Sequence, residues 1–157
     1  MLKIIEATTG SDYDAVRQLC WEYRDHLLGL SPEDEVIVRM FYPRDAYLTI
    51  MENLPQEHAP PNGCVKIALH DGEPVGCGMI HKLMPGTAEI KRVFVRQEAR
   101  GLGAGRAMMA ALIDQCRADG FSRIYMDTAK ALTTAQKLYF ALGFKSHGPY
   151  QEVPEEA

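Results

Sequence analysis

The sequence contains no long hydrophobic run. Its 157 residues are 46% hydrophobic and 24% charged, but no stretch approaches the roughly 20 apolar residues that a membrane-spanning helix needs. The opening residues, MLKIIEA, include an acid at Glu6 and lack the apolar segment of a secretory signal. We therefore expect a cytoplasmic protein with no membrane partner.

The sequence also lacks clustered cysteines and an excess of basic residues. Four cysteines lie far apart without a Cys-x-x-Cys pair, which fits neither a zinc site nor a disulfide framework. We expect buried free thiols and no metal. Lys and Arg number 17 against 21 Asp and Glu, for a net charge of −4. Since nucleic-acid binding requires a basic footprint on phosphates, nucleic acid is not an expected partner.

No repeat, linker or low-complexity segment divides the chain. One domain of about 100–200 residues is the usual size, so residues 1–157 are expected to form a single domain. In the first half, the pattern predicts a strand over Leu2–Ala7 and a helix over 11–28 that opens with a capping box at Ser11–Asp14. A second helix is predicted to begin at Ser31 and to end at Pro43.

The second half begins after a predicted loop, Gln56–Gly63, where the hydrophobic period changes from helical to strand-like. Helices are predicted between Arg106 and Gly120 and over Leu132–Leu142. Strands are predicted at Cys64–Leu69, Val75–Leu83, Thr87–Val95, Phe121–Thr128 and Phe144–His147. This order of elements predicts an α/β fold with one mixed sheet and helices on both faces.

A glycine-rich loop, Arg100–Arg106, joins a predicted strand to a predicted helix. Glycines let the backbone approach a ligand closely, and the start of a helix presents unpaired N–H groups. Residues 87–106 contain five basic and two acidic residues in an otherwise acidic protein. The loop therefore predicts an anion site suited to a pyrophosphate.

The loop departs from two common nucleotide-binding motifs. A P-loop requires Gly-Lys-Ser/Thr, but Gly105 is followed by Arg106. A Rossmann fingerprint requires GxGxxG directly after a strand, whereas five residues separate Val95 from Gly101. Asp127 on the next strand mimics the ribose-binding acid, which keeps a dinucleotide-binding oxidoreductase as an alternative.

Two blocks of the sequence resemble the GNAT superfamily of N-acetyltransferases. Arg100-x-x-Gly103-x-Gly105 is similar to its Q/R-x-x-G-x-G/A signature, and Ala135-x-x-Leu138-Tyr139-x-x-x-Gly143-Phe144 is similar to its A-x-x-L-Y-x-x-x-G-F block. The resemblance covers roughly residues 2–150. It implies a GNAT-like single domain with a central mixed, mostly antiparallel sheet of six or seven strands.

The resemblance implies acetyl-CoA as the co-substrate. The backbone of Val93, Phe94 and Val95 would pair with the pantetheine amides like an added strand. The pyrophosphate would lie on the backbone N–H groups of the loop and helix start, which comprise Arg100, Gly101, Leu102, Gly103, Ala104, Gly105 and Arg106.

The resemblance also implies catalytic residues for the direct attack of an amine on the thioester. Tyr139 stands where the family places the acid that protonates the thiolate, and Glu89 stands near the place of a glutamate base. Glu89 shares one strand face with Lys91, Val93 and Val95 unless a bulge intervenes. A core tyrosine and a solvated or ion-paired glutamate are the alternatives. Further candidates for polar lining or the base are Tyr23, His81, Asp127 and His147.

The sequence departs from the family in two places. Leu132 stands where many relatives have an asparagine that contacts the cofactor, and the chain is one strand shorter at its end. An exposed sheet edge gives a reason to expect a homodimer.

We therefore expect an acetyl-CoA-dependent N-acetyltransferase that acts on a primary amine, with a small molecule as the expected acceptor. A protein N-terminus or lysine stays open as acceptor. The acids Glu33, Asp34 and Glu35 favour a cationic one. A non-catalytic acyl-CoA-binding or sensor domain is the alternative from another functional class.

Overall fold

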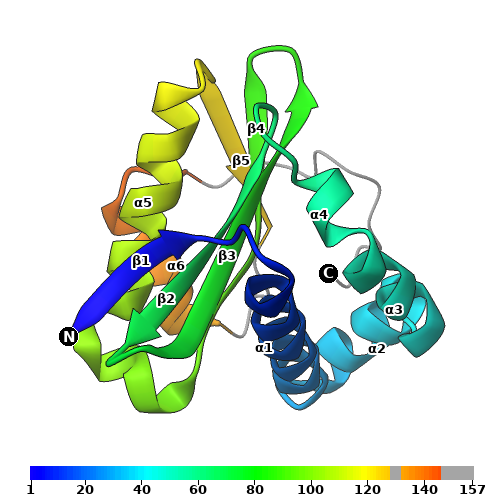
Figure 1. Ribbon diagram of the computed structural model, residues 1–157. Helices are drawn as coiled ribbons and strands as arrows, with labels where there is room; N and C mark the ends of the chain where they lie inside the picture. The colour runs from blue at the N-terminus through cyan, green and yellow to red at the C-terminus, as the bar shows by residue number, and fades with distance from the viewer. Residues whose placement is uncertain (128–131, 146–157) are drawn as a thin grey trace.

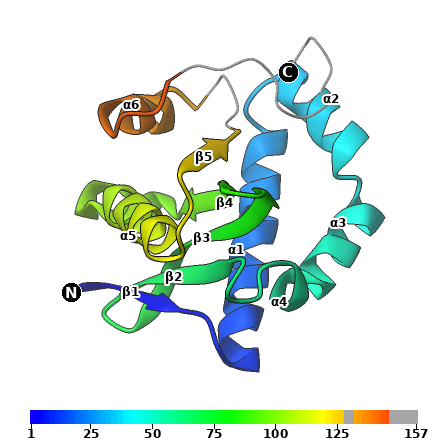
Figure 2. The same cartoon turned by 90° about the horizontal axis from the view of Figure 1, so that it is seen from above.

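A sheet of five strands runs through the structure, with helices on both faces (Figure 1 and Figure 2). The computed structural model describes residues 1–127 and 132–145. The elements in chain order are β1 (Leu2–Glu6), α1 (Gly10–Leu28), α2 (Pro32–Phe41), α3 (Arg44–Glu52), α4 (Leu54–Glu57), β2 (Cys64–His70), β3 (Glu73–Met84), β4 (Thr87–Val95), the 3-10 helix η1 (Gln97–Leu102), α5 (Ala104–Ala118), β5 (Arg123–Met126) and α6 (Thr133–Ala141).

The strands lie in the order β1-β2-β3-β4-β5. Pairing is antiparallel from β1 to β4, whereas β4 and β5 pair in parallel because α5 crosses over between them. The sheet is therefore mixed rather than mostly antiparallel. The predicted α/β class with helices on both faces is confirmed, but the predicted six or seven strands are corrected to five in the described residues.

The predicted strand Phe144–His147 accounts for the lower count. Phe144 and Lys145 are not in a strand, and positions 146 and 147 lie outside the described residues. Gly143 has φ +102, and the N–H of Phe144 donates to the carbonyl of Tyr139 at 3.1 Å. The chain after α6 is therefore used to end the helix, as is common for a glycine in the left-handed region.

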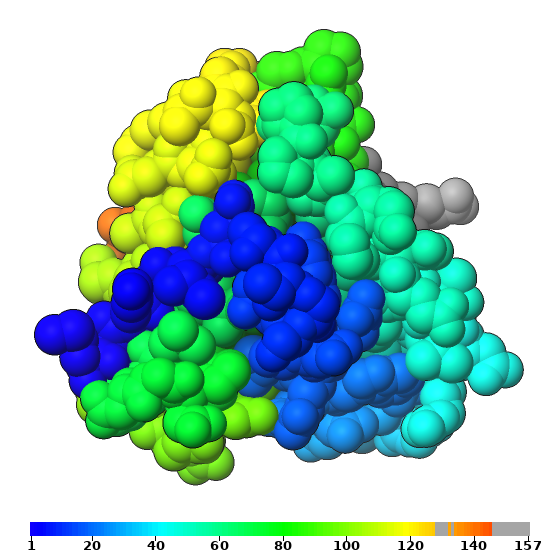
Figure 3. Space-filling model, viewed as in Figure 1, coloured from blue at the N-terminus to red at the C-terminus, as the bar shows by residue number. Residues whose placement is uncertain are grey.

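The sheet separates two hydrophobic layers. On one face α5 and α6 pack against a core that includes Ile80, Ile90, Met108, Met109 and Leu112. On the other face α1, α3 and α4 pack against Val65, Ile67, Cys77, Met79 and Phe94. In the space-filling view the chain from α1 to α4, coloured blue to green, forms a continuous layer beside the strands (Figure 3).

Helix starts follow from short polar motifs, although one lies earlier than predicted. The N-cap of α1 is Thr9, whose hydroxyl accepts from the Asp12 N–H at 3.0 Å while the Asp12 carboxylate accepts from the Thr9 N–H at 3.1 Å. This pair replaces the predicted box at Ser11–Asp14, because a threonine two residues earlier supplies the same geometry. Ser31 and the following proline begin α2 as predicted.

Two other sequence predictions, the loop before β2 and the free cysteines, can be compared with the structure. The predicted loop Gln56–Gly63 begins inside the helical turn α4, so its boundary is corrected. All four cysteines are buried and free, as predicted. Among the described helices, none combines the length and the apolar character required to cross a membrane.

Candidate functional site

The strands β4 and β5 separate part-way along their length. Their pairing runs from Thr87↔Arg123 to Ile90↔Met126, and beyond it no described strand pairs with this edge of β4. A bulge at Arg92, which has φ +51, shifts the pairing of β4 with β3 at the same level. The backbone of Val93–Val95 therefore borders an opening in the sheet.

The bulge corrects the expectation that four alternate residues share one face. Lys91 pairs with Met79 of the core under α1, so Lys91 and Glu89 lie on the α1 side. Val93 and Val95 pack into the core under α5 instead. The extra residue reverses the alternation, and Glu89 is thereby separated from the valines at the end of β4.

The glycine-rich loop ends at the start of α5. Gly103 is the N-cap with φ +78, no side chain caps α5, and its first turn has no acidic residue. A Cβ built at Gly101 or Gly103 meets nothing within 4 Å, so the loop surface is open. Ala104 is buried beneath this surface. The first N–H groups of α5, which have no partner within the helix, are therefore available to an anion.

The arginines on either side of this helix start differ in their contacts. Arg100 is exposed, and its Nε donates to the carbonyl of Val95 at 3.1 Å. Arg106 and Leu102 are exposed at the helix start. A Cβ built on Gly105 would lie 3.6 Å from Cδ2 of Leu138, so this glycine packs against α6. The predicted cofactor residues are thus contiguous from the end of β4 to the first turn of α5, and Arg100, Gly101, Leu102, Gly103 and Arg106 are the exposed ones among them.

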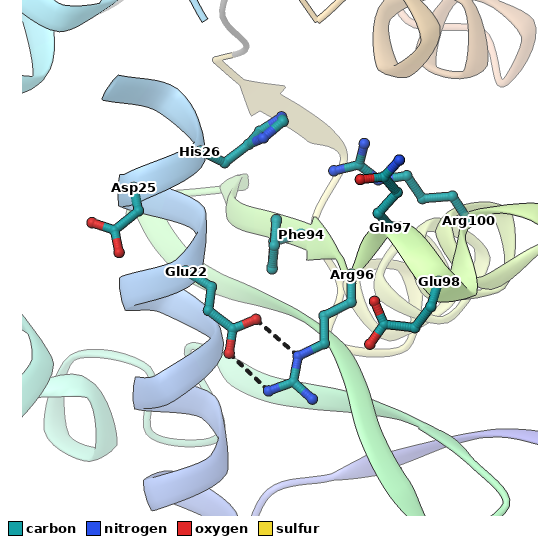
Figure 4. A pocket seen from close by; sticks show the side chains of 8 residues that line it. All are labelled: Glu22, Asp25, His26, Phe94, Arg96, Gln97, Glu98 and Arg100. Carbon is teal, nitrogen blue, oxygen red and sulfur yellow. Dashed lines mark hydrogen bonds and ion pairs between the residues drawn. The ribbon is translucent and has the colours of Figure 1, made fainter. Parts of the chain in front are cut away.

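A cavity of about 460 Å³ lies between this loop and α1. Its lining comprises Glu22, Asp25, His26, Phe94, Arg96, Gln97, Glu98 and Arg100 (Figure 4). Glu22 of α1 accepts two hydrogen bonds from Arg96, at 2.8 and 2.7 Å, which lower the pKa of this carboxyl. The pair fixes α1 against the end of β4 and holds the cavity wall in place.

Tyr139 lies on α6 and is 8% exposed. Its ring meets Phe144 edge-on at 6.3 Å, and burial raises its pKa to about 12. Tyr23 lies on α1, and its pKa is raised by burial and by the proximity of Tyr139. Both phenols are therefore protonated at neutral pH, and they belong to the two layers on opposite faces of the sheet.

Glu89 of β4 is 2% exposed and lies among titratable side chains. His81 Nε2 on β3 is 2.5 Å from Glu89 Oε1, and Lys91 Nζ is 3.8 Å from the same oxygen. Partial burial and the negative charge of Glu89 raise the pKa of Asp127, which follows β5. The structure thus brings together Glu89, His81 and Asp127, whereas His147 lies outside the described residues.

Sequence reasoning missed His58, which follows α4 and has no exposed surface. Its Nδ1 is 2.8 Å from the carbonyl of Ile80, and its ring meets His81 edge-on at 5.7 Å. Burial lowers its pKa to about 4. Nε2 has no hydrogen-bond partner among the described residues. No motif surrounds His58 in the sequence, so only the folded contact with β3 could reveal it.

Sequence comparison finds similar proteins among acetyltransferases. A model of the acetyltransferase (GNAT) family matches residues 13–144. An uncharacterized N-acetyltransferase of Schizosaccharomyces pombe is 34% identical over 106 residues, which are 66% of this chain and 65% of that protein. An IAA acetyltransferase of Azospirillum brasilense is 31% identical over 128 residues, covering 76% of this chain and 84% of that protein. The chain thus spans just under two thirds of the yeast relative's length.

Acetyltransferases are among the solved structures that share this fold. An acetyltransferase of the GNAT family from Staphylococcus aureus is 19% identical, with a TM-score of 0.77 over 99% of this chain and 91% of that chain. AAC(6')-Iy, solved with a bisubstrate analog, is 20% identical, with a TM-score of 0.68 over 99% of this chain and 98% of that chain. At these identities the likeness is one of fold.

Proposed function

Because the chain belongs to the acetyltransferase (GNAT) family, we propose that it transfers an acetyl group from acetyl-CoA to a primary amine of a small molecule. The family uses acetyl-CoA, and the bound analog of AAC(6')-Iy is CoA-S-monomethyl-acetylneamine. The observation that carries the proposal is the buried Glu89 beside His81, next to the opening in the sheet.

The residues around the opening fit acetyl-CoA. An uncapped helix start without acids suits its pyrophosphate, and the open surface at Gly101 and Gly103 lets that group reach the N–H groups. The edge of Val93–Val95 that β5 leaves unpaired suits the pantetheine amides. Leu132 gives no side-chain hydrogen bond to the cofactor, so the backbone carries this recognition.

Glu89 is proposed as the general base. When bound, acetyl-CoA supplies a thioester carbon that an unprotonated amine attacks. An ammonium acceptor must first lose a proton, and Glu89 accepts it on the carboxylate that His81 orients. Burial of Glu89 strengthens its interaction with a cationic amine, because water screens the pair less there.

Tyr139 is proposed as the general acid. As the N–C bond forms and the C–S bond breaks, the electron pair leaves with sulfur, and the phenol of Tyr139 gives its proton to the thiolate. A pKa of about 12 keeps this phenol protonated at neutral pH, so it is present as a donor in every turnover.

Two of the acids expected to attract the acceptor make contacts within α2. Glu33, Asp34 and Glu35 form the first turn of α2, where Asp34 caps the helix with Ser31 and Glu35 pairs with Arg39. Recognition of the acceptor is therefore proposed to rest on residues between β4 and the α1–α4 layer. A homodimer stays a prediction, with exposed apolar side chains on α2 and α3 as the surface available for it.

Release of the CoA thiol, measured over a panel of amines and peptides, tests the proposed function. We expect turnover that depends on a small primary amine. Acetyl-CoA binding without turnover on any acceptor would instead support a sensor, and stabilisation by NAD but not by acetyl-CoA would support the oxidoreductase. Either result would end the proposal.

A further inference from the structure

Arg92 is a partly buried arginine without a carboxylate partner in the described part of the chain. Its Nη1 donates to the sulfur of Met79 at 3.6 Å. Arg96, four residues further on, instead forms two hydrogen bonds with Glu22. A thioether is a weak acceptor, so within the described residues most of the hydrogen-bonding capacity of the Arg92 guanidinium is unused.

The side chain of Arg92 lies in the region between β4 and the helices α1 and α2. Its contact with Met79 places it on the sheet face that α1 covers. Its positive charge opposes the rise that burial imposes on the pKa of Tyr23 and of Tyr42. Within the described residues, neither phenol hydroxyl forms a hydrogen bond. One guanidinium and two phenol hydroxyls therefore lie in this region and can form further hydrogen bonds, judged by the described residues.

The carboxylate of Glu89 in the same region, unlike the Arg92 guanidinium, has charged or titratable partners. Glu89 is held by His81 and Lys91, three positions before Arg92 on the strand. Three strand residues span about 10 Å along the backbone. Because both side chains are long, the distance between the Glu89 carboxylate and the Arg92 guanidinium can be shorter than this. A ligand bound between Glu89 and Arg92 would therefore meet a carboxylate at one end and, at the other, a guanidinium without a carboxylate partner among the described residues. That arrangement is complementary to a zwitterion.

We propose that Arg92 binds a carboxylate of the acceptor, which is therefore an amino carboxylate. This inference rests on the proposed function and names its substrate class. The amine lies toward Glu89, and the carboxylate receives two hydrogen bonds from the guanidinium, the geometry that arginine favours. Tyr23 and Tyr42 supply additional hydroxyl donors at the carboxylate end.

A carboxylate fits this region better than a phosphate does. The negative charges of Asp127, Glu89 and Glu57 all act on Tyr42, beside Arg92. A phosphate adds a second negative charge that one guanidinium and Lys91 would have to offset among these acids. A carboxylate adds a single charge and matches the planar fork of arginine.

Calorimetric titration with CoA present tests the proposal without turnover. The probes are the twenty common L-amino acids, β-alanine and 4-aminobutyrate, each paired with its amide, and phosphoethanolamine. We expect at least one free acid to bind about 10- to 100-fold more tightly than its amide, as hydrogen bonds to a charged group predict. This preference is measured on the unaltered protein, so it does not depend on any variant folding.

Two substitutions assign the preference to Arg92. Arg92→Met is expected to abolish the difference between acid and amide, and Arg92→Lys to restore part of it. Affinity for CoA stays within about twofold, since the loop that binds it is elsewhere. Arg44→Met is the matched control, because Arg44 is exposed on α3 and stacks over Trp21 at 5.4 Å. It is expected to retain the full preference.

Three results would overturn the proposal: equal binding of acids and amides, tighter binding of phosphoethanolamine, or a preference that survives in Arg92→Met. A purely structural arginine would weaken acids and amides alike and lower the melting temperature. Failure of the proposed function is separate, because it appears as absent CoA release with every amine whatever the binding preference.

Discussion

The two sides of the opening between β4 and β5 expose different kinds of polar group. On the α5 side the backbone dominates, with an uncapped helix start, a left-handed Gly103 and the unpaired edge of Val93–Val95. On the α1–α4 side the polar groups are side chains such as Glu89 and Arg92. Binding through backbone groups depends on the conformation of a short segment, so it restricts only the few residues of that segment. Side-chain recognition can change with the acceptor, so substitutions on the two sides should affect different binding steps.

Glu89→Gln is expected to have the largest effect. The amide keeps the size of the side chain but cannot accept a proton from the acceptor, so kcat should fall about 10²- to 10⁴-fold. The KM for acetyl-CoA should stay within about twofold, because Glu89 lies on the acceptor side of the bulge. Steady-state kinetics of CoA release measures both values.

Glu33→Gln is the matched control for this change. Glu33 is exposed in the first turn of α2, and its substitution makes the same chemical change away from the site. Full kcat is expected. A Glu89→Gln protein that retains wild-type kcat would remove Glu89 from the mechanism and leave the α1 side without a base.

Tyr139→Phe is expected to lower kcat by at least about 10-fold, the weaker end of acid–base effects. Thiolates leave more readily than alkoxides, so protonation of the sulfur contributes less than removal of the ammonium proton. Because the ring and its contact with Phe144 remain, acetyl-CoA should still bind with wild-type affinity in a calorimetric titration.

Tyr13→Phe serves as the control for Tyr139→Phe. Tyr13 lies in α1 beside a separate cavity, so loss of its hydroxyl should leave kcat unchanged. If Tyr139→Phe also turns over at the wild-type rate, Tyr139 is a packing residue of α6.

The sequence predicted those parts of the candidate site whose residues are close together in the chain. The glycine loop, its helix and α6 follow from local spacing, and in the structure residues of α5 and α6 pack in one core. The bulge at Arg92 was not predictable, because nothing in the VFV run marks a residue with φ +51. One extra residue there moves Glu89 and Val95 to opposite faces. The last strand was overpredicted because Phe144 is apolar yet serves to end α6.

The acceptor side was less predictable for a topological reason. His58, His81 and Arg92 come from three separate segments that meet only when the sheet forms. None has a motif around it, and each alone is an ordinary polar residue. Their association depends on register and on the position of α4, which local patterns do not encode.

Gly103→Ala tests the backbone side of the comparison. Gly103 has φ +78, which costs a residue with a Cβ roughly 1–2 kcal/mol. The start of α5 should then shift or become strained, which weakens acetyl-CoA binding by about 10-fold. Acceptor binding, measured separately with a bound amine ligand, should change little.

Gly10→Ala controls for the loss of a glycine. Gly10 begins α1 without a positive φ, and its Cβ meets nothing within 4 Å. Acetyl-CoA affinity should be unchanged in this variant. Equal weakening in the two variants would contradict a specific role for the left-handed residue at the start of α5.

His58 gives the smallest expected effect, on the pH dependence of stability. Its folded pKa of about 4 lies below the ordinary value of 6.5, so the unfolded chain binds the extra proton first as the pH falls. The neutral form is therefore favoured by folding above pH 6.5, and this stabilisation is lost between pH 6.5 and 4. The free energy of unfolding should fall by up to about 1.4 kcal/mol per pH unit in that range.

Urea unfolding of His58→Gln at several pH values separates this contribution from simple loss of packing. The amide can still donate to the Ile80 carbonyl, but it does not titrate, so the variant should be less stable at pH 7 and have a shallower slope below pH 6.5. His70→Gln, at a partly exposed position on β2, should keep the wild-type slope. An unchanged slope in His58→Gln would mean that His58 takes up its proton at the same pH in the folded protein and in the unfolded chain. A buried imidazolium would then form beside His81 below about pH 6.5.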